Sequence, residues 1–254
     1  MEKTAAIIIG ASSGLASAIC EQWLRDRKID AVIAISRKNI KDIVLVNKEP
    51  DNRKIFHAME CDYGEPSIHS CCEQIDELMQ QYQLDSVTRV CICNGILHNE
   101  NVWPEKRIEE IDSKTLLEVF SINTVIPMLW LKALLNIVKG KTECIITVFN
   151  ARIGSISDNR SGGWYSYRAS KAALNMLLKT AAIEYARRAK NVKLISFHPG
   201  TTDTPLSRPF QRSIDNDSLF TAGFVAKHLI DIMNLKHADG ELSFIDWEDK
   251  SIAW

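Results

Sequence analysis

Two side chains that can move a proton stand four residues apart in the segment Tyr167-Arg168-Ala169-Ser170-Lys171. On a helix this spacing places the Tyr167 phenol and the Lys171 ammonium group on one face. A phenol is a weak acid, and lowering its pKa by about three units takes about 4 kcal/mol, which a neighbouring cation can supply. A tyrosine tuned in this way can give a proton to a carbonyl oxygen or take one from an alcohol. Solvated helices show the same spacing, so the interpretation depends on the rest of the chain.

A glycine-rich turn follows the first apolar run of the chain, Ala5–Ile9, and precedes a stretch with helical spacing. Glycines let a backbone turn sharply and approach a pyrophosphate, while the N–H groups at a helix start point toward the anion. We therefore expect this turn to bind the phosphates of a dinucleotide through Gly10, Ser12, Ser13, Gly14 and Leu15.

The second predicted strand, Ala31–Ile35, is followed by Ser36-Arg37-Lys38, where no acidic residue is present. An Asp or Glu at that place accepts hydrogen bonds from the ribose hydroxyls of NAD. Arg37 can pair with a 2′-phosphate instead and stack on the adenine. The sequence favours NADP(H) over NAD(H), although a solvated arginine at a strand end would have the same appearance.

Strand-like and helical stretches alternate along the chain. Several strands are continuous apolar runs, as a parallel sheet covered on both faces requires. We predict an α/β fold, a Rossmann-type doubly wound parallel sheet in a single domain over residues 1–254. The predicted strands are Ala5–Ile9, Ala31–Ile35, Lys54–Glu60, Arg89–Cys93, Cys144–Phe149, Val192–Phe197 and Leu242–Ile245. The predicted helices are Leu15–Arg27, Pro66–Gln83, Ser113–Val138, Ser166–Ala189 and Ala222–Leu235, and Asn39–Asn52 is expected to be irregular.

Composition argues against several classes of function. The net charge of -1 gives no reason to expect nucleic acid or an anionic membrane as a partner. The uninterrupted apolar runs are shorter than the roughly 18 residues of a membrane span, and the N-terminus is typical of a strand rather than a secretory signal. The 7 cysteines have no framework spacing, which indicates reduced thiols in a cytoplasmic protein, packed as small hydrophobes and not as metal ligands.

Taken in order, the motifs resemble those of the short-chain dehydrogenase/reductase family. The resemblance covers about residues 5–205 and rests on Gly10-x-x-x-Gly14-x-Ala16, Asp62, Asn94-Gly95, Asn123, Tyr167-x-x-x-Lys171 and Pro199-Gly200-Thr201-Thr202-Asp203-Thr204. The run from Gly162 to Asn175 is similar to the branch that contains C-factor-type signalling proteins and related carbonyl reductases.

The resemblance implies a role for each matched residue. Asp62 would bind the adenine edge, and Asn94 and Gly95 would line the adenosine ribose. Asn123 would kink its helix and hold a water that relays protons through Lys171. One segment would close over the nicotinamide: Pro199, Gly200, Thr202 and Thr204.

One departure from the family concerns catalysis. A serine usually stands three residues before the glycine that follows the fifth strand, and here Ala151 holds that place before Gly154. We expect Ser155 to supply the missing catalytic hydroxyl, with Ser157 and Asn150 as further candidates.

Two functions therefore stay open. The first is an NADP(H)-dependent oxidoreductase that acts on a small carbonyl or alcohol substrate, with Tyr167 as general acid/base assisted by Lys171. The second is a C-factor-like, dinucleotide-binding signalling protein with weak or lost activity, an alternative that Ala151 supports. His98 and the segment Leu206–Phe220 are candidate substrate contacts or ordinary surface loops.

Assembly is expected from the same resemblance. Family members commonly pair through the helices that here contain Asn123 and Tyr167, which predicts a homodimer or homotetramer. The apolar side chains on the second helix fit an intramolecular core equally well: Leu174, Leu177, Leu178 and Ala181.

Overall fold

The computed structural model describes residues 2–38, 54–213, 215 and 218–254. The segment Asn39–Asn52, which the sequence predicts to be irregular, lies outside these residues.

Seven parallel strands form one sheet in the order β3-β2-β1-β4-β5-β6-β9. The strands are β1 (Thr4–Ile9), β2 (Ala31–Ser36), β3 (Ile55–Glu60), β4 (Ser86–Ile92), β5 (Cys144–Phe149), β6 (Val192–His198) and β9 (Leu242–Asp246). Strands β1, β2 and β5 are buried along their whole length, as their continuous apolar sequences predict. The chain reverses its direction across the sheet between β1 and β4, so the predicted doubly wound fold is confirmed.

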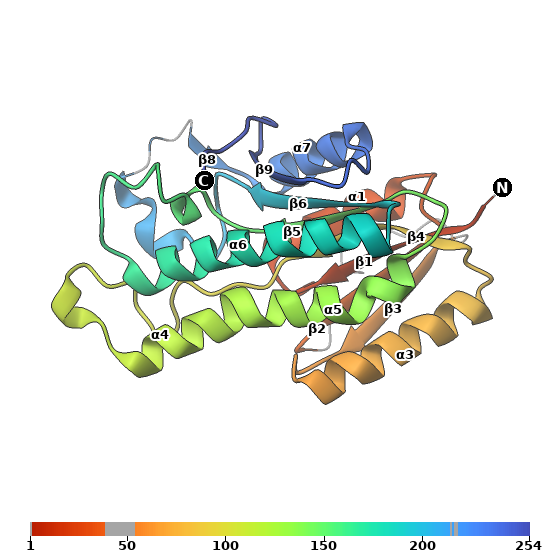
Figure 1. The fold of residues 1–254 in the computed structure, drawn as a ribbon, viewed down its shortest axis with the longest axis horizontal. Coiled ribbons are helices and arrows are strands. Elements are labelled where there is room, and N and C mark those ends of the chain that lie inside the picture. Colours follow the sequence, from red (N-terminus) through yellow and green to blue (C-terminus); the bar gives the residue numbers. More distant parts are fainter. Residues whose placement is uncertain (1, 39–53, 214, 216–217) are drawn as a thin grey trace.

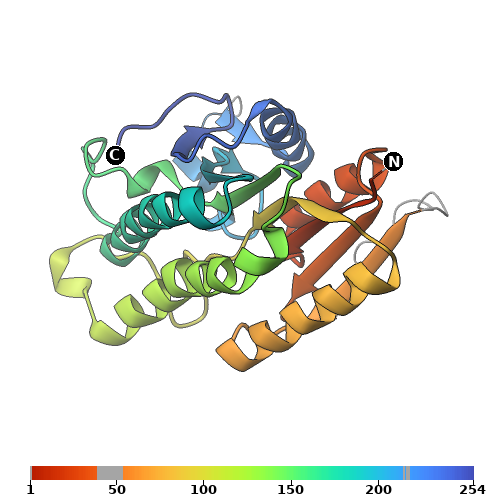
Figure 2. The ribbon, with the colours of Figure 1, turned by 45° about the vertical axis from the view of Figure 1, so that its right-hand side comes forward.

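Helices cover both faces of the sheet (Figures 1 and 2). One face carries α1 (Gly14–Arg25) and α7 (Ala222–Leu235), and the other carries α3 (Glu65–Gln81), α5 (Ile126–Val138) and α6 (Tyr165–Arg188). Each face therefore has its own apolar core, which buries side chains of the alternate strand residues. Six of the seven cysteines are buried in these layers, and all seven are free thiols.

The predicted helix Ser113–Val138 contains a distortion. It consists of α4 (Ser113–Phe120), a π-helical turn η2 (Ser121–Val125) and then α5. By length and composition alone this helix could cross a membrane, but α5 packs in the core against α3, α6 and β4. Pro127 lacks an N–H and so cannot donate a regular helical bond just after the π-helical turn.

Short elements in the connecting segments were not predicted. Strands β7 (Thr201–Thr202) and β8 (Leu219–Phe220) form a small parallel pair, and the described residues include the 3₁₀ turns η1 (Ile108–Glu110), η3 (Arg152–Gly154) and η4 (Arg208–Ser213). Elements of two to six residues are too short to produce a clear periodic pattern.

The helix proposed for subunit pairing has both buried and exposed apolar residues. Leu174 and Leu178 are fully buried in the core, whereas Leu177, Met176 and Ile183 on the same helix are exposed. The first two are thus explained by the fold of one chain, and the homo-oligomer stays a prediction.

Candidate active site

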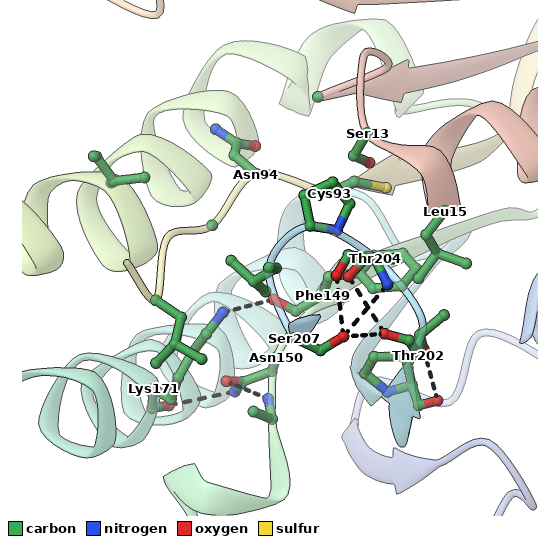
Figure 3. A pocket seen from close by; sticks show the side chains of 18 of the residues that line it. Ser13, Leu15, Cys93, Asn94, Phe149, Asn150, Lys171, Thr202, Thr204 and Ser207 are labelled. Atoms are coloured by element: carbon green, nitrogen blue, oxygen red, sulfur yellow. Dashed lines mark hydrogen bonds between the residues drawn. The ribbon is translucent and has the colours of Figure 1, made fainter. Parts of the chain in front are cut away.

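A cavity of about 630 Å³ opens at the carboxyl ends of the strands, where the strand order reverses. It is lined by every residue that the sequence assigns to cofactor binding: Gly10, Ser12, Ser13, Gly14, Leu15, Arg37, Asp62, Asn94, Gly95, Tyr167, Lys171, Pro199, Gly200, Thr202 and Thr204. Residues far apart in the chain therefore meet in one cavity, and Figure 3 shows how the labelled lining side chains lie.

The turn after β1 is built for an anion. Gly10 has a φ of +82°, and a Cβ there would lie 3.0 Å from the backbone nitrogen of Asn94, so only glycine fits. A Cβ on Gly14 would meet nothing within 4 Å, because this backbone faces the open cavity. The Ser13 hydroxyl caps α1 by accepting a hydrogen bond from the Ala16 N–H at 3.2 Å. The start of α1 thus presents its backbone to the cavity where a phosphate group would bind.

Polar groups without partners mark the next part of the cavity. Both polar atoms of the Asn94 carboxamide are buried and have no hydrogen-bond partner in the described part of the chain. Leaving such atoms unpaired is costly, which is the situation expected where a ligand supplies the partners. At the end of β2 the Arg37 guanidinium lies 6.0 Å from the ring centre of Tyr63, next to Asp62. The phosphate-binding turn, the unpaired Asn94 carboxamide and the Arg37 cation together fit a dinucleotide.

Tyr167 and Lys171 share one wall of this cavity, on the first turns of α6. The Lys171 Nζ lies 5.9 Å from the centre of the Tyr167 ring and donates a hydrogen bond of 3.1 Å to the Phe149 carbonyl (Figure 3). Burial raises the pKa of Tyr167 to about 12 and lowers the pKa of Lys171 to about 8. Desolvation of both groups thus outweighs the expected pull of the ammonium on the phenol pKa. Tyr167 consequently holds its proton at neutral pH, as a proton donor must.

Asn123 lies behind this pair, at the π-helical turn. It is fully buried and does not line the cavity itself. Its Oδ1 accepts a hydrogen bond from the Ile96 N–H at 2.7 Å, and its Nδ2 donates to the Ile96 carbonyl at 2.9 Å and to the Ser170 hydroxyl at 3.2 Å. Asn123 therefore ties the segment after β4 to α6. The expected helix distortion is present, and the water relay stays a prediction.

Beyond Tyr167 the cavity is bounded by aromatic rings. The ring centres of Tyr167 and Trp164 are 6.2 Å apart, and those of Trp164 and Phe210 are 5.0 Å apart. Behind them His98 packs against Phe210 and stacks on Trp103 at 5.3 Å. We call Trp164, Phe210, Trp103 and His98 the aromatic wall. The sequence indicated His98 and the segment that carries Phe210 as candidate substrate contacts, but not the contacts among these rings, which join loops far apart in the chain.

Comparison with known proteins decides the family. The model of the short chain dehydrogenase family matches residues 4–215. The chain belongs to this family. It is an oxidoreductase, and the resemblance drawn from its motifs is confirmed.

The chain is 26% identical over 220 residues to a benzil reductase ((S)-benzoin forming) of Bacillus cereus, covering 87% of this chain and 84% of the relative. It is 27% identical over 145 residues to the C-signal protein of Myxococcus xanthus, covering 57% of this chain and 82% of that protein. The crystal structure of an NADPH-bound carbonyl reductase from chicken fatty liver has the same fold, with a TM-score of 0.83, 21% identity and full coverage of both chains.

This short chain dehydrogenase departs from its family at the position of the usual catalytic serine. Ala151 lines the cavity there, but Ser155 does not. The buried Ser155 hydroxyl accepts a hydrogen bond from the Asp158 N–H at 3.1 Å, which corrects the expectation that it faces a substrate. Ser155 follows the 3₁₀ turn η3, and Ser157 does not line the cavity either.

Asn150, the other candidate donor, is already engaged. Its Nδ2 donates to Asn175 Oδ1 at 2.6 Å and to the Ser196 hydroxyl at 3.0 Å, and its Oδ1 accepts from the Ala151 N–H at 2.9 Å. This buried network holds β5, β6 and α6 together and leaves Asn150 no free donor for a substrate carbonyl.

Among the residues in and beside the site that the sequence analysis missed are His198 and Glu105. His198 lines the cavity at the end of β6, where burial and the nearby Arg152 lower its pKa to about 4, so its imidazole is neutral. Its place directly before Pro199 was a signal that could have found it. Glu105 is buried next to the start of α6, and no spacing motif marks it.

Proposed function

We propose that this short chain dehydrogenase reduces a carbonyl compound to an alcohol with NADPH, and that Tyr167 donates the proton. The observation that carries the proposal is the placement of the Tyr167–Lys171 pair in the wall of a cavity whose other end is a phosphate cradle. A proton donor and a dinucleotide site in one hollow are what carbonyl reduction requires.

The cofactor preference rests on Arg37. When bound, NADPH supplies the hydride for the carbonyl carbon. The turn Gly10–Gly14 would hold its pyrophosphate, Asn94 its adenosine ribose, and Arg37 its 2′-phosphate. The NADPH-bound chicken carbonyl reductase, which has this fold, is consistent with that choice.

The proton comes from the protein. Tyr167 holds its proton at neutral pH and gives it to the substrate oxygen, so the carbonyl gains one hydride and one proton in all. The phenolate that remains is stabilised by the Lys171 ammonium group, which the Phe149 carbonyl holds in place. Asn123 keeps the helix backbone around Ser170 fixed to the neighbouring loop.

We infer an uncharged aromatic substrate with an activated carbonyl. The substrate end is bounded by Trp164 and Phe210 together with Leu97, Ile153 and Leu206, and no described lining residue there other than Lys171 carries a charge. The benzil reductase of Bacillus cereus, named for an aromatic diketone, supports this class. Ala151 also supports it, because a carbonyl already polarised by a second carbonyl depends less on a hydroxyl donor from the protein.

Carbonyl-dependent loss of NADPH absorbance tests the proposal. We expect turnover of 1-phenyl-1,2-propanedione to exceed that of 2,3-butanedione, which lacks the ring, and that of acetophenone, which lacks the second carbonyl. NADH should support less turnover than NADPH. The absence of turnover with all three compounds would contradict the proposal.

A second candidate is a dinucleotide-binding signalling protein. Ala151 and the similarity to the C-signal protein favour it. Under this function Tyr167→Phe would leave the biological activity intact, whereas replacing Gly10 would abolish it.

A further inference from the structure

The start of helix α6 is held by a carboxylate from another part of the chain. Glu105, only 3% exposed, lies in the segment between β4 and η1, 61 residues before its partner. Its Oε2 accepts a hydrogen bond from the Ser166 N–H at 3.1 Å, and its Oε1 accepts one from the Ser166 hydroxyl. Its backbone carbonyl accepts a further bond from the Trp164 N–H at 2.5 Å. Glu105 thus accepts hydrogen bonds from two residues at the start of α6, Trp164 and Ser166.

Helix α6 has no cap of its own at this end. Trp164 stands at the N-cap position and provides no side-chain hydrogen bond, so the first N–H groups depend on an external acceptor. A negative charge is favoured at a helix N-terminus, because the backbone dipoles are aligned there. The Glu105 carboxylate is therefore the cap of α6.

The same contact holds Trp164 in an unusual conformation. Its backbone is left-handed, with φ +54° and ψ +45°, which a bulky residue adopts only where the surroundings hold it. Gly163, directly before it, has φ +65°, and a Cβ there would lie in ordinary contact with the Glu105 carbonyl oxygen, at 3.4 Å. Glu105 thus contacts the backbone that carries the Trp164 ring.

The bonds to Glu105 are made at Trp164 itself and at Ser166, the residue directly before Tyr167. Trp164 forms the aromatic wall with Phe210, and Tyr167 follows Ser166 directly in the chain. We propose that Glu105 is a positioning residue, which fixes the Trp164 ring and the Tyr167 hydroxyl relative to each other across the substrate end of the cavity. The proposal rests on carbonyl reduction as the function of this site.

The test compares three variants. Glu105→Ala removes the cap, and Glu105→Gln keeps an oxygen that accepts the Ser166 N–H. Glu110→Ala is the control, because the exposed Glu110 also accepts a backbone N–H in the same segment, from Lys106 at 2.8 Å. The readouts are hydrogen–deuterium exchange of a peptide spanning residues 164–170 without ligand, NADPH affinity, and the kinetics of 1-phenyl-1,2-propanedione reduction.

We expect exchange in Glu105→Ala to be at least about tenfold faster over this peptide. We expect kcat/KM for the dione to fall by about a hundredfold, since a small misplacement of reacting groups has an effect of that size. NADPH affinity should stay within about twofold, because the phosphate-binding turn belongs to β1 and α1. Glu105→Gln should recover most of the exchange protection and of kcat, and Glu110→Ala should match the wild type.

Three results would overturn the proposal. One is wild-type exchange in Glu105→Ala. Another is faster exchange with unchanged kcat/KM, which would leave Glu105 a purely structural cap. The third is an equal loss of NADPH affinity, which would indicate general unfolding. If the wild type reduces no carbonyl compound, carbonyl reduction itself fails, and the exchange measurement still reports separately whether Glu105 holds α6.

Discussion

The Lys171 ammonium nitrogen lies 5.9 Å from the centre of the Tyr167 ring, and both side chains face the same cavity. Burial shifts the pKa values of the two groups in opposite directions. It raises the pKa of Tyr167 to about 12 and lowers the pKa of Lys171 to about 8, because each group loses solvation of its charged form. The pair is consequently fully protonated only on the acidic side of the Lys171 pKa.

This relationship predicts the pH dependence of carbonyl reduction. Below a pH of about 8 Tyr167 can donate its proton and Lys171 can stabilise the phenolate. Above it Lys171 loses its charge first, and we expect kcat/KM to fall about tenfold per pH unit. Lys171→Arg, which stays charged, should be slower but should lose this alkaline decrease. A profile that is the same in both proteins would contradict the assignment.

Arg37 should determine the preference for the phosphorylated cofactor. Arg37→Asp removes the partner of a 2′-phosphate and adds an acceptor for ribose hydroxyls, so the ranking of NADPH and NADH should reverse. We expect NADPH affinity to fall by about tenfold to a hundredfold, as for the loss of one charged hydrogen bond. Tryptophan quenching titrations measure both affinities, and Lys38→Asp is the control with the same change in charge. Equal losses in the two variants would mean that only net charge matters.

Replacing Ala151 should affect two substrates to different extents. Ala151→Ser restores a hydroxyl in the cavity wall at the place of the family serine. A donor to a developing alkoxide is worth about a hundredfold or more in rate. We expect the gain in kcat to be larger for acetophenone than for 1-phenyl-1,2-propanedione, whose second carbonyl already polarises the first. An equal gain with both substrates would show that the substrate argument from Ala151 is wrong.

Gly154 should be required for the packing of η3 on α6. A Cβ there would lie 2.8 Å from the Lys171 carbonyl carbon, so Gly154→Ala must displace backbone. We expect a loss of about 1–3 kcal/mol in the free energy of unfolding. Thermal denaturation measures it, with Gly140→Ala as the control, since a Cβ on Gly140 would meet nothing within 4 Å. Equal melting temperatures of the two variants would contradict the prediction.

The residues that the sequence assigns to the cofactor lie together in one cavity, for a physical reason. Gly10, Asp62 and Asn94 each follow a predicted strand, and parallel strands bring their carboxyl ends to one edge. Residues that follow successive strands in the chain therefore lie close together at this edge of the sheet.

The substrate end was less predictable because its contacts join loops without periodic patterns. Trp164 meets Phe210 across 46 residues, and Glu105 meets Ser166 across 61. The expectation for Ser155 was wrong for a related reason. Ser155 follows Gly154 directly in the chain, but the position of its hydroxyl depends on the path of the backbone through η3.

The central claim is that this protein transfers a hydride to a carbonyl carbon with a proton from Tyr167. The most direct test is reduction of 1-phenyl-1,2-propanedione with NADPH deuterated at C4 of the nicotinamide, followed by mass spectrometry of the product. We predict deuterium at the carbinol carbon with the wild type, and a rate lower by about a hundredfold to ten-thousandfold with Tyr167→Phe at unchanged NADPH affinity. Tight NADPH binding without deuterated product in the wild type would contradict the claim and favour the signalling function.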